Sequence, residues 1–170
     1  MIRYAEQRDA PDLARIYNDA IKPDIYATCD VTPVGPENRL AWLAHHHHPY
    51  PAWVYETESG QVIGWCSLSP FSVRPGFSGV AETSVYVDEA SRYRRIGTEL
   101  LRHLIAEGRT LGFRSLVSLV FEKNIASVST RLRYGFRPHV VMYEVAQMRE
   151  AWENVLWLQK DLVVEDLLPQ

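Results

Sequence analysis

The stretch 81–101, AETSVYVDEASRYRRIGTELL, predicts a strand, an arginine-rich turn and the start of a helix. The strand carries one acid, Glu82, in an otherwise apolar and neutral run, and Gly97 opens the amphipathic helix. Unpaired backbone N–H groups and the dipole at a helix N-terminus both favour an anion. The stretch therefore predicts a pyrophosphate site with an acid about one strand-length away.

The bulk composition narrows the class of protein. A chain of 170 residues with 46% hydrophobic content is long enough for one buried core, so we expect a single domain over 1–170. The net charge of −3 argues against nucleic acid as a partner. The two cysteines have neither metal-type nor redox-type spacing, and no apolar run reaches the length of a membrane span. We expect a cytoplasmic protein without a membrane partner.

Apolar spacing along the chain predicts alternating strands and helices. The first helix is expected to open at Asp9 and Pro11, with Asp9 as its N-cap, and to end before Pro23. Further helices are expected at 37–44, 97–111 and 124–134. Strands are expected at 2–5, 53–56, 62–68, 81–87, 115–121, 136–145 and 155–162. This order predicts a mixed α/β (α+β) fold, a mixed sheet with helices on its faces.

Several short motifs follow one another along the chain in an order that indicates a family. They are Ile2-Arg3, ARIYNDAI at 14–21, Thr32-Pro33, Asn38-Arg39, AETSVYV at 81–87, Asn124-Ile125-Ala126-Ser127 and Gly135-Phe136. In this order the chain resembles the GNAT acyltransferase superfamily, and above all its phosphinothricin and methionine-sulfone acetyltransferase group. The resemblance implies a mostly antiparallel sheet of about seven strands with about four helices, splayed between 81–87 and 115–121.

The resemblance also implies acetyl-CoA as cosubstrate, with no metal. In the family's pattern of Gln or Arg, two residues, Gly, one residue, and Gly or Ala, Arg92 and Gly97 match the first and last positions. Arg95 replaces the middle glycine, which normally lets the backbone approach the phosphates closely. The implied cofactor-binding residues are Val85, Tyr86, Val87, Arg92, Tyr93, Arg94, Arg95, Ile96, Gly97, Thr98, Asn124 and Ser127.

The resemblance also indicates how residues 85–87 and Asn124 would contact the cofactor. Residues 85–87 are implied to offer main-chain groups to the pantetheine arm, in the manner of an added strand. Asn124 is either a cofactor contact or a plain helix N-cap, and both readings can hold.

Acetyl transfer to an amine needs a base, because an alkylammonium titrates near the lysine value. Glu82 is the candidate catalytic base, since a lone carboxylate in an apolar strand is costly unless it is used or paired. The alternative is a solvated or salt-bridged structural acid. The main-chain N–H of Val87 is the implied oxyanion donor. Relatives often carry Tyr or His where this chain has Thr130 and Arg131, so no general acid is assigned.

The resemblance also implies that the acceptor amine binds at the loop 72–79 and the residues next to it. Arg74 falls on an Arg of the phosphinothricin-group loop, and Phe77 and Phe71 fall on aromatic positions, so the three are the expected substrate-binding residues. An Arg fork suits the carboxylate of an amino acid. We expect a small-molecule amine as acceptor and a homodimer as assembly. Alternatives are a peptide N-terminus or a polyamine as acceptor, and a CoA-binding sensor without catalysis.

The run His45–His48 raises a metal-binding alternative. Neighbouring residues at the end of a helix do not share one face, which disfavours a joint metal site.

Overall fold

The computed structural model describes residues 1–22, 24–92 and 94–163, and its strands form one seven-stranded sheet in the order β1-β2-β3-β4-β5-β7-β6. The strands are β1 (Ile2–Tyr4), β2 (Ala52–Glu56), β3 (Val62–Pro70), β4 (Val80–Val87), β5 (Ser115–Phe121), β6 (Arg137–Met148) and β7 (Ala151–Asp161). The α-helices are α1 (Ala10–Asn18), α2 (Pro36–Ala44), α3 (Ile96–Thr110) and α4 (Ile125–Arg133). The fold expected from the sequence is confirmed.

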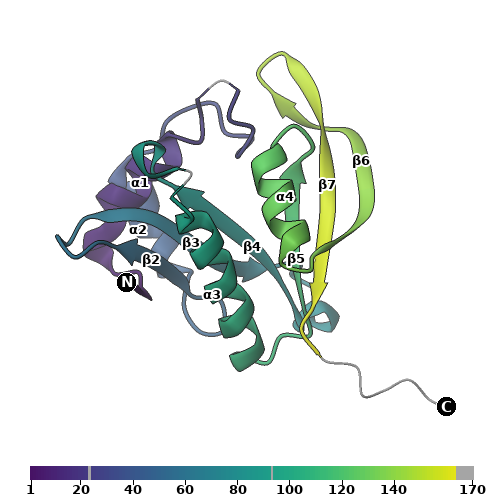
Figure 1. Ribbon diagram of the computed structural model, residues 1–170, viewed down its shortest axis with the longest axis horizontal. Coiled ribbons are helices and arrows are strands. Elements are labelled where there is room, and N and C mark those ends of the chain that lie inside the picture. Colours follow the sequence, from purple (N-terminus) through teal and green to yellow (C-terminus); the bar gives the residue numbers. More distant parts are fainter. Residues whose placement is uncertain (23, 93, 164–170) are drawn as a thin grey trace.

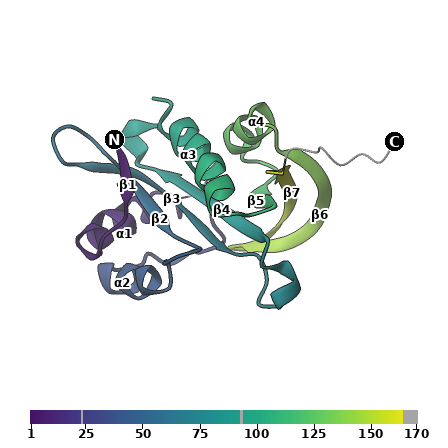
Figure 2. The ribbon, with the colours of Figure 1, turned by 90° about the horizontal axis from the view of Figure 1, so that it is seen from below.

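The helices form layers on the two faces of this sheet. Helices α3 and α4 cover one face, whereas α1 and α2 cover the other face beneath β1 to β3 (Figures 1 and 2). Leu100 and Leu104 of α3 pack against Leu116 of β5 in the larger core. Leu13 of α1 packs with Trp65 of β3 in the smaller core on the opposite face. The α1 side of β5, β7 and β6 carries no helix in the described chain (Figure 2).

Strands β4 and β5 are paired over a short length and then separate. They are parallel, whereas the other neighbouring strands are antiparallel, and their register joins Val80 to Ser115 and Glu82 to Val117. The Thr83 hydroxyl donates to the Val117 carbonyl at 3.2 Å and shares a hydrogen bond with the Ser118 hydroxyl. Beyond Thr83 the ladder ends, which confirms the expected splay; we call this opening the fork.

Asp9 occupies the N-cap position of α1, as predicted, but its side chain does not cap the helix. Its backbone is already helical, with φ −83° and ψ −9°, and its carboxylate makes no cap hydrogen bond to α1. The carboxylate instead accepts from the Glu6 N–H at 2.8 Å and from the Arg3 guanidinium at 2.8 and 2.9 Å. The Asp9 carboxylate thus binds Arg3 of β1 instead of the free N–H groups at the start of α1. The last strand also begins earlier than expected, at Ala151 instead of 155.

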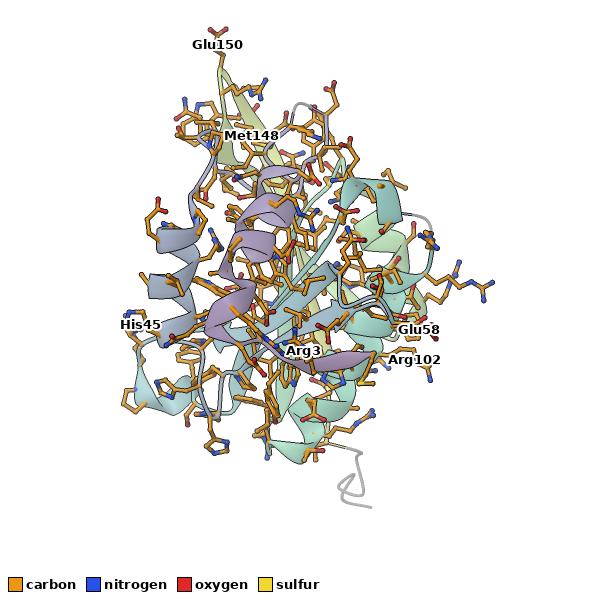
Figure 3. The ribbon with its side chains drawn as sticks, turned by 90° about the vertical axis from the view of Figure 1, so that its left-hand side faces the viewer. Arg3, His45, Glu58, Arg102, Met148 and Glu150 are labelled. Atoms are coloured by element: carbon orange, nitrogen blue, oxygen red, sulfur yellow. The ribbon has the colours of Figure 1, made fainter. Side chains whose placement is uncertain are left out.

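Arg3 joins three elements at one end of the sheet (Figure 3). Besides Asp9 it binds Glu56 of β2, with its Nε 2.9 Å from the carboxylate, while the Asp9 side chain is 4% exposed. Burial opposes ionisation of Asp9, but the hydrogen bonds from Arg3 and Glu6 outweigh it and hold the pKa of Asp9 below its usual value. The Arg3 hydrogen bond likewise lowers the pKa of Glu56.

We predict that Arg3→Met lowers the free energy of unfolding by about 3 kcal/mol at pH 7, because it leaves the buried Asp9 carboxylate without its cation. Since both carboxyl pKa values are lowered in the fold, this stabilisation is present above their ordinary values and is lost as pH falls through the folded values. Urea unfolding at pH 7 and pH 3 measures both effects.

The matched control is Arg8→Met. Arg8 pairs with Glu6, but both side chains are more than half exposed, so the change should be small. Equal losses in the two variants would contradict a special role for Arg3.

Candidate functional site

An open pocket of about 520 Å³ lies at the fork, between the end of β4 and the first turns of α3 and α4. Helices α3 and α4 stand side by side on the same face of the sheet (Figure 1). Ten of the residues expected to bind a cofactor line it: Val85, Tyr86, Val87, Arg92, Arg95, Ile96, Gly97, Thr98, Asn124 and Ser127. Arg94 is exposed and is not among the lining residues, and Tyr93 lies outside the described residues.

The edge of β4 that faces the fork carries unpaired backbone groups. The Asp88 N–H donates to the Ile63 carbonyl of β3 at 2.9 Å. Because N–H groups alternate along a strand, the Tyr86 N–H also faces β3, and those of Val85 and Val87 face the fork. This edge can therefore accept an extended ligand as an additional strand.

The N-terminus of α3 forms the basic end of the pocket. No side chain caps it, so its first N–H groups are available to an anion. Arg95 precedes the helix in the left-handed conformation, with φ +67° and ψ 3°. Glycine adopts this conformation most readily, so the turn keeps the backbone shape of the glycine pattern although the residue is an arginine.

Asn124 connects the start of α4 to segment 24–27, which forms one wall of the pocket. Its side-chain oxygen accepts from the Ser127 N–H at 3.1 Å, which confirms the helix N-cap, and its amide donates to the Tyr26 carbonyl at 3.1 Å. The Lys123 ammonium lies 5.1 Å from the centre of the Tyr26 ring. Segment 24–27 is thereby held against α4 as a wall that the sequence did not predict, because the segment has no hydrophobic period.

Arg131 of α4 is a second wall residue to which the sequence analysis gave no role. It is 7% exposed, one guanidinium nitrogen donates to the Ser127 hydroxyl, and its Nε has no partner among the described residues. Burial lowers the pKa of Arg131 to about 10. The sequence did contain an indication that Arg131 is buried. Arg131 follows Val128 by three positions, so helical spacing places it on the buried face of α4.

Glu82 lies on β4 between Ser69 of β3 and Val117 of β5. Its side chain is partly buried, and burial raises its pKa above the ordinary value for Glu. Among the described residues, no ion pair and no side-chain hydrogen bond reaches its carboxylate. The salt-bridge alternative is therefore not supported, and Glu82 remains a carboxylate with raised proton affinity.

Three aromatic rings gather on the face of the sheet that Glu82 shares. The Phe71 ring lies 5.1 Å from the Trp157 ring and 5.7 Å from the Phe77 ring. Phe71 follows β3 and Trp157 belongs to β7, so their contact spans β4 and β5. Trp157 pairs with Leu119, two residues beyond Val117, which places Trp157 on the face of Glu82. The loop that carries Phe71 and Phe77 projects from this face (Figure 2).

Arg74 stands in the same loop, directly before the short turn Pro75–Phe77. Its side chain is exposed, and the structure does not bring it into the aromatic group. Any contact between Arg74 and a ligand would therefore be made at the solvent side of the rings.

The pocket and Glu82 lie along one strand. Glu82 precedes Val85 by three residues, about 10 Å along β4. A ligand held at the α3 end and extended along the free edge of β4 would thus direct its far end toward Glu82. A second reactant could approach from the aromatic side.

The histidine run forms no ligand cluster. His46 stacks on Trp42 with ring centres 3.6 Å apart and bonds to the Trp42 carbonyl and the Ser69 hydroxyl. His45 lies at the outer end of α2 (Figure 3). No set of three or more His, Cys, Asp or Glu residues is placed for a metal ion in the described chain.

None of the described helices combines the length and apolar character needed to cross a bilayer.

Comparison with known proteins decides the family. A family model described as the acetyltransferase (GNAT) family matches residues 13–136. The chain belongs to the GNAT acetyltransferase family. An L-methionine sulfoximine/L-methionine sulfone acetyltransferase of Pseudomonas paraeruginosa is 34% identical to this chain. The match covers 95% of this chain and 94% of the Pseudomonas protein.

Two solved structures resemble this GNAT acetyltransferase closely. A ribosomal-protein-alanine N-acetyltransferase from Brucella melitensis has a TM-score of 0.91 and 36% identity, covering 95% of this chain and 99% of that one. A phosphinothricin acetyltransferase from Sinorhizobium meliloti, solved in complex with acetyl-CoA, has a TM-score of 0.88 and 26% identity, covering 95% and 88%. The fold of this chain is thus that of the family.

We predict that Gly97→Ala weakens CoA binding at least several-fold without harming the fold. In the described structure a Cβ at Gly97 would meet the Val87 side chain at 3.5 Å, an ordinary contact, and Ala favours a helix by up to about 1 kcal/mol. The methyl group would instead occupy the pocket wall. Calorimetric titration with CoA and thermal unfolding measure the two effects.

Gly76→Ala is the control, because Gly76 lies in the loop outside the pocket with open space around it. Unchanged CoA affinity in Gly97→Ala would show that no ligand approaches this turn closely.

Proposed function

We propose that this acetyl-CoA-dependent N-acetyltransferase acetylates the primary amine of a small amino acid or amino-acid analogue of the phosphinothricin or methionine sulfone type. The observation that carries the proposal is Glu82, a carboxylate with no ion-pair partner among residues 1–22, 24–92 and 94–163, on the strand whose far end borders the pocket. The Pseudomonas relative, named for acetylation of amino-acid analogues, supports the acceptor class.

The residues proposed to hold acetyl-CoA are those of the pocket. The N-terminus of α3, with Arg92 and Arg95 beside it, offers backbone N–H groups and positive charge to the pyrophosphate. Val85 and Val87 offer backbone groups to the pantetheine arm. In the Sinorhizobium relative acetyl-CoA is the bound ligand, which supports this assignment.

The proposed reaction is direct attack by the amine within a ternary complex. Glu82 takes the proton of the acceptor ammonium, directly or through a water, and its raised pKa makes it a stronger base than an exposed Glu. The Val87 N–H, which faces the fork, donates to the thioester oxygen as negative charge develops there. Neither Cys29 nor Cys66 is proposed as a nucleophile, since burial raises the pKa of both thiols.

The acceptor is proposed to bind on the aromatic side of Glu82. Phe71 and Phe77, together with Trp157, offer apolar surface to its side chain. Arg74, exposed at the start of the same loop, is proposed to bind its carboxylate in a bidentate manner. Trp157 is an addition to the residues expected from the sequence.

A peptide N-terminus is the second candidate acceptor. The similarity to the Brucella ribosomal-protein-alanine enzyme favours it. Thiol release from acetyl-CoA with free amino acids, methionine sulfone, phosphinothricin and an alanyl peptide tests both candidates. Turnover with the free amino acids supports the proposal, and turnover confined to the peptide contradicts it. CoA binding without turnover on any amine would indicate a sensor.

We predict that Glu82→Gln lowers kcat/KM by about 100-fold or more, because the base is lost, while CoA affinity is unchanged. Steady-state kinetics and CoA titration measure the two quantities. In the wild type, activity should fall as the solution is acidified through the raised pKa of Glu82. Wild-type turnover in the variant would rule out Glu82 as the base.

We also predict that Glu82→Gln is at least as stable as the wild type at pH 7. Since burial raises the pKa of Glu82 in the fold, its stabilising contribution is present below the ordinary Glu pKa and is lost as pH rises through the folded value. The advantage of the variant should therefore shrink toward pH 4 in urea unfolding. A clear destabilisation at pH 7 would mean that the carboxylate has a structural partner.

A further inference from the structure

Arg131 is a buried cation in the wall of the pocket at the fork, and no carboxylate of the described residues forms an ion pair with it. It is 7% exposed, and its hydrogen bond in the described structure goes to the neutral hydroxyl of Ser127 on the same helix. Its Nε is buried and without a partner among the described residues. A buried charge is normally paired, because desolvation costs several kcal/mol per ion.

The surroundings of Arg131 leave its charge uncompensated in the unliganded protein. Burial lowers the pKa of Arg131 to about 10, so it remains protonated at neutral pH. Across the pocket, burial raises the pKa of Tyr86 on β4, so this phenol is neutral. The other charged lining groups are Asp24, Arg92, Arg95 and Lys123, and Lys123 is paired with Glu153. The missing counter-ion is therefore expected to arrive with the ligand.

We propose that Arg131 is the counter-ion of the CoA thiolate that acetyl transfer releases, an inference that rests on the proposed function. In that step the amine nitrogen bonds to the acetyl carbon and the carbon–sulfur bond breaks. The electron pair of that bond stays on sulfur. Glu82 holds the proton taken from the ammonium before attack, and the second proton leaves the nitrogen to solvent water as the amide forms. The anion thus forms on sulfur, and Arg131 pairs with it.

The arrangement of charges favours sulfur over the other anions of CoA. The phosphates have their own partners at the α3 end, namely Arg92, Arg95 and the free N–H groups of the helix. Arg131 belongs to α4, which lies apart from α3 on the same face of the sheet (Figure 1), and it lines the same pocket as Tyr86 of the strand edge proposed for the pantetheine arm. An acetyl group has no charge, so at that end of the ligand the thiolate is the anion that the reaction generates.

With Arg131 in this role, the reaction needs no general acid to protonate the leaving sulfur. A free thiol has a pKa of about 8.5, and a cation in contact lowers it. A thiolate stabilised by a fixed guanidinium leaves without protonation at the moment of bond cleavage.

The test compares CoA with desulfo-CoA, which lacks the thiol, by calorimetric titration at pH 6.5 and pH 9. If binding lowers the thiol pKa by one unit, the ratio of CoA affinity to desulfo-CoA affinity rises about sevenfold between these pH values. Effects of the phosphates and of the other lining groups cancel in the ratio. The guanidinium of Arg131 keeps its charge over this range, because arginine is not deprotonated in proteins.

Three variants complete the test. Arg131→Gln should abolish the rise and Arg131→Lys should retain part of it. Arg133→Gln removes an exposed arginine of the same helix and should leave the rise intact. If Arg131→Gln does not fold, as judged by circular dichroism, the wild-type ratio and the Lys variant decide the question.

A wild-type ratio that does not change with pH overturns the inference and leaves the proposed function standing. A preference for succinyl-CoA over acetyl-CoA that disappears in Arg131→Gln, with no pH effect, also overturns it and assigns the cation to an acidic acyl group. Failure of the wild type to bind either CoA or desulfo-CoA would instead contradict the proposed function.

Discussion

The separation of β4 from β5 is the constraint on which the rest of the site depends. Three paired positions hold the strands together, and the hydroxyls of Thr83 and Ser118 mark the last contact before they diverge. An open strand edge inside a sheet is costly, since its N–H and C=O groups lose their partners. The pocket at the fork, the helix ends around it and the proposed strand-like ligand all follow from that edge.

Two uncompensated side chains frame the fork. In the part of the chain that the structure describes, Glu82 lies before the fork with no cation paired to it, and Arg131 lies beyond the fork with no anion paired to it. Each lowers stability in the unliganded protein, and each is complementary to a charge of the proposed reaction, the acceptor ammonium and the leaving thiolate. The Arg3 network shows the opposite arrangement, in which a cation between two carboxylates serves the fold. The contrast separates structural ion pairs from functional charges.

The sequence predicted the elements well where the information is local. The strand, basic turn and helix of 81–101 were predicted from apolar spacing, and the N-cap at Asn124 from its residue type. Asp9 takes the predicted N-cap position, but its carboxylate binds Arg3 of β1 instead of the helix N–H groups, a pairing that residue type alone does not reveal. The wall formed by 24–27 has no period to detect, and the charge state of Arg131 depends on burial that appears only in three dimensions.

The measurement closest to the central claim is amide hydrogen exchange along β4 with and without CoA. The account predicts new protection at the N–H groups of Val85 and Val87, which face the fork, and little change at Tyr86, whose N–H already faces β3. Unchanged exchange at Val85 and Val87 under saturating CoA would contradict the account, because the free strand edge would then have no ligand.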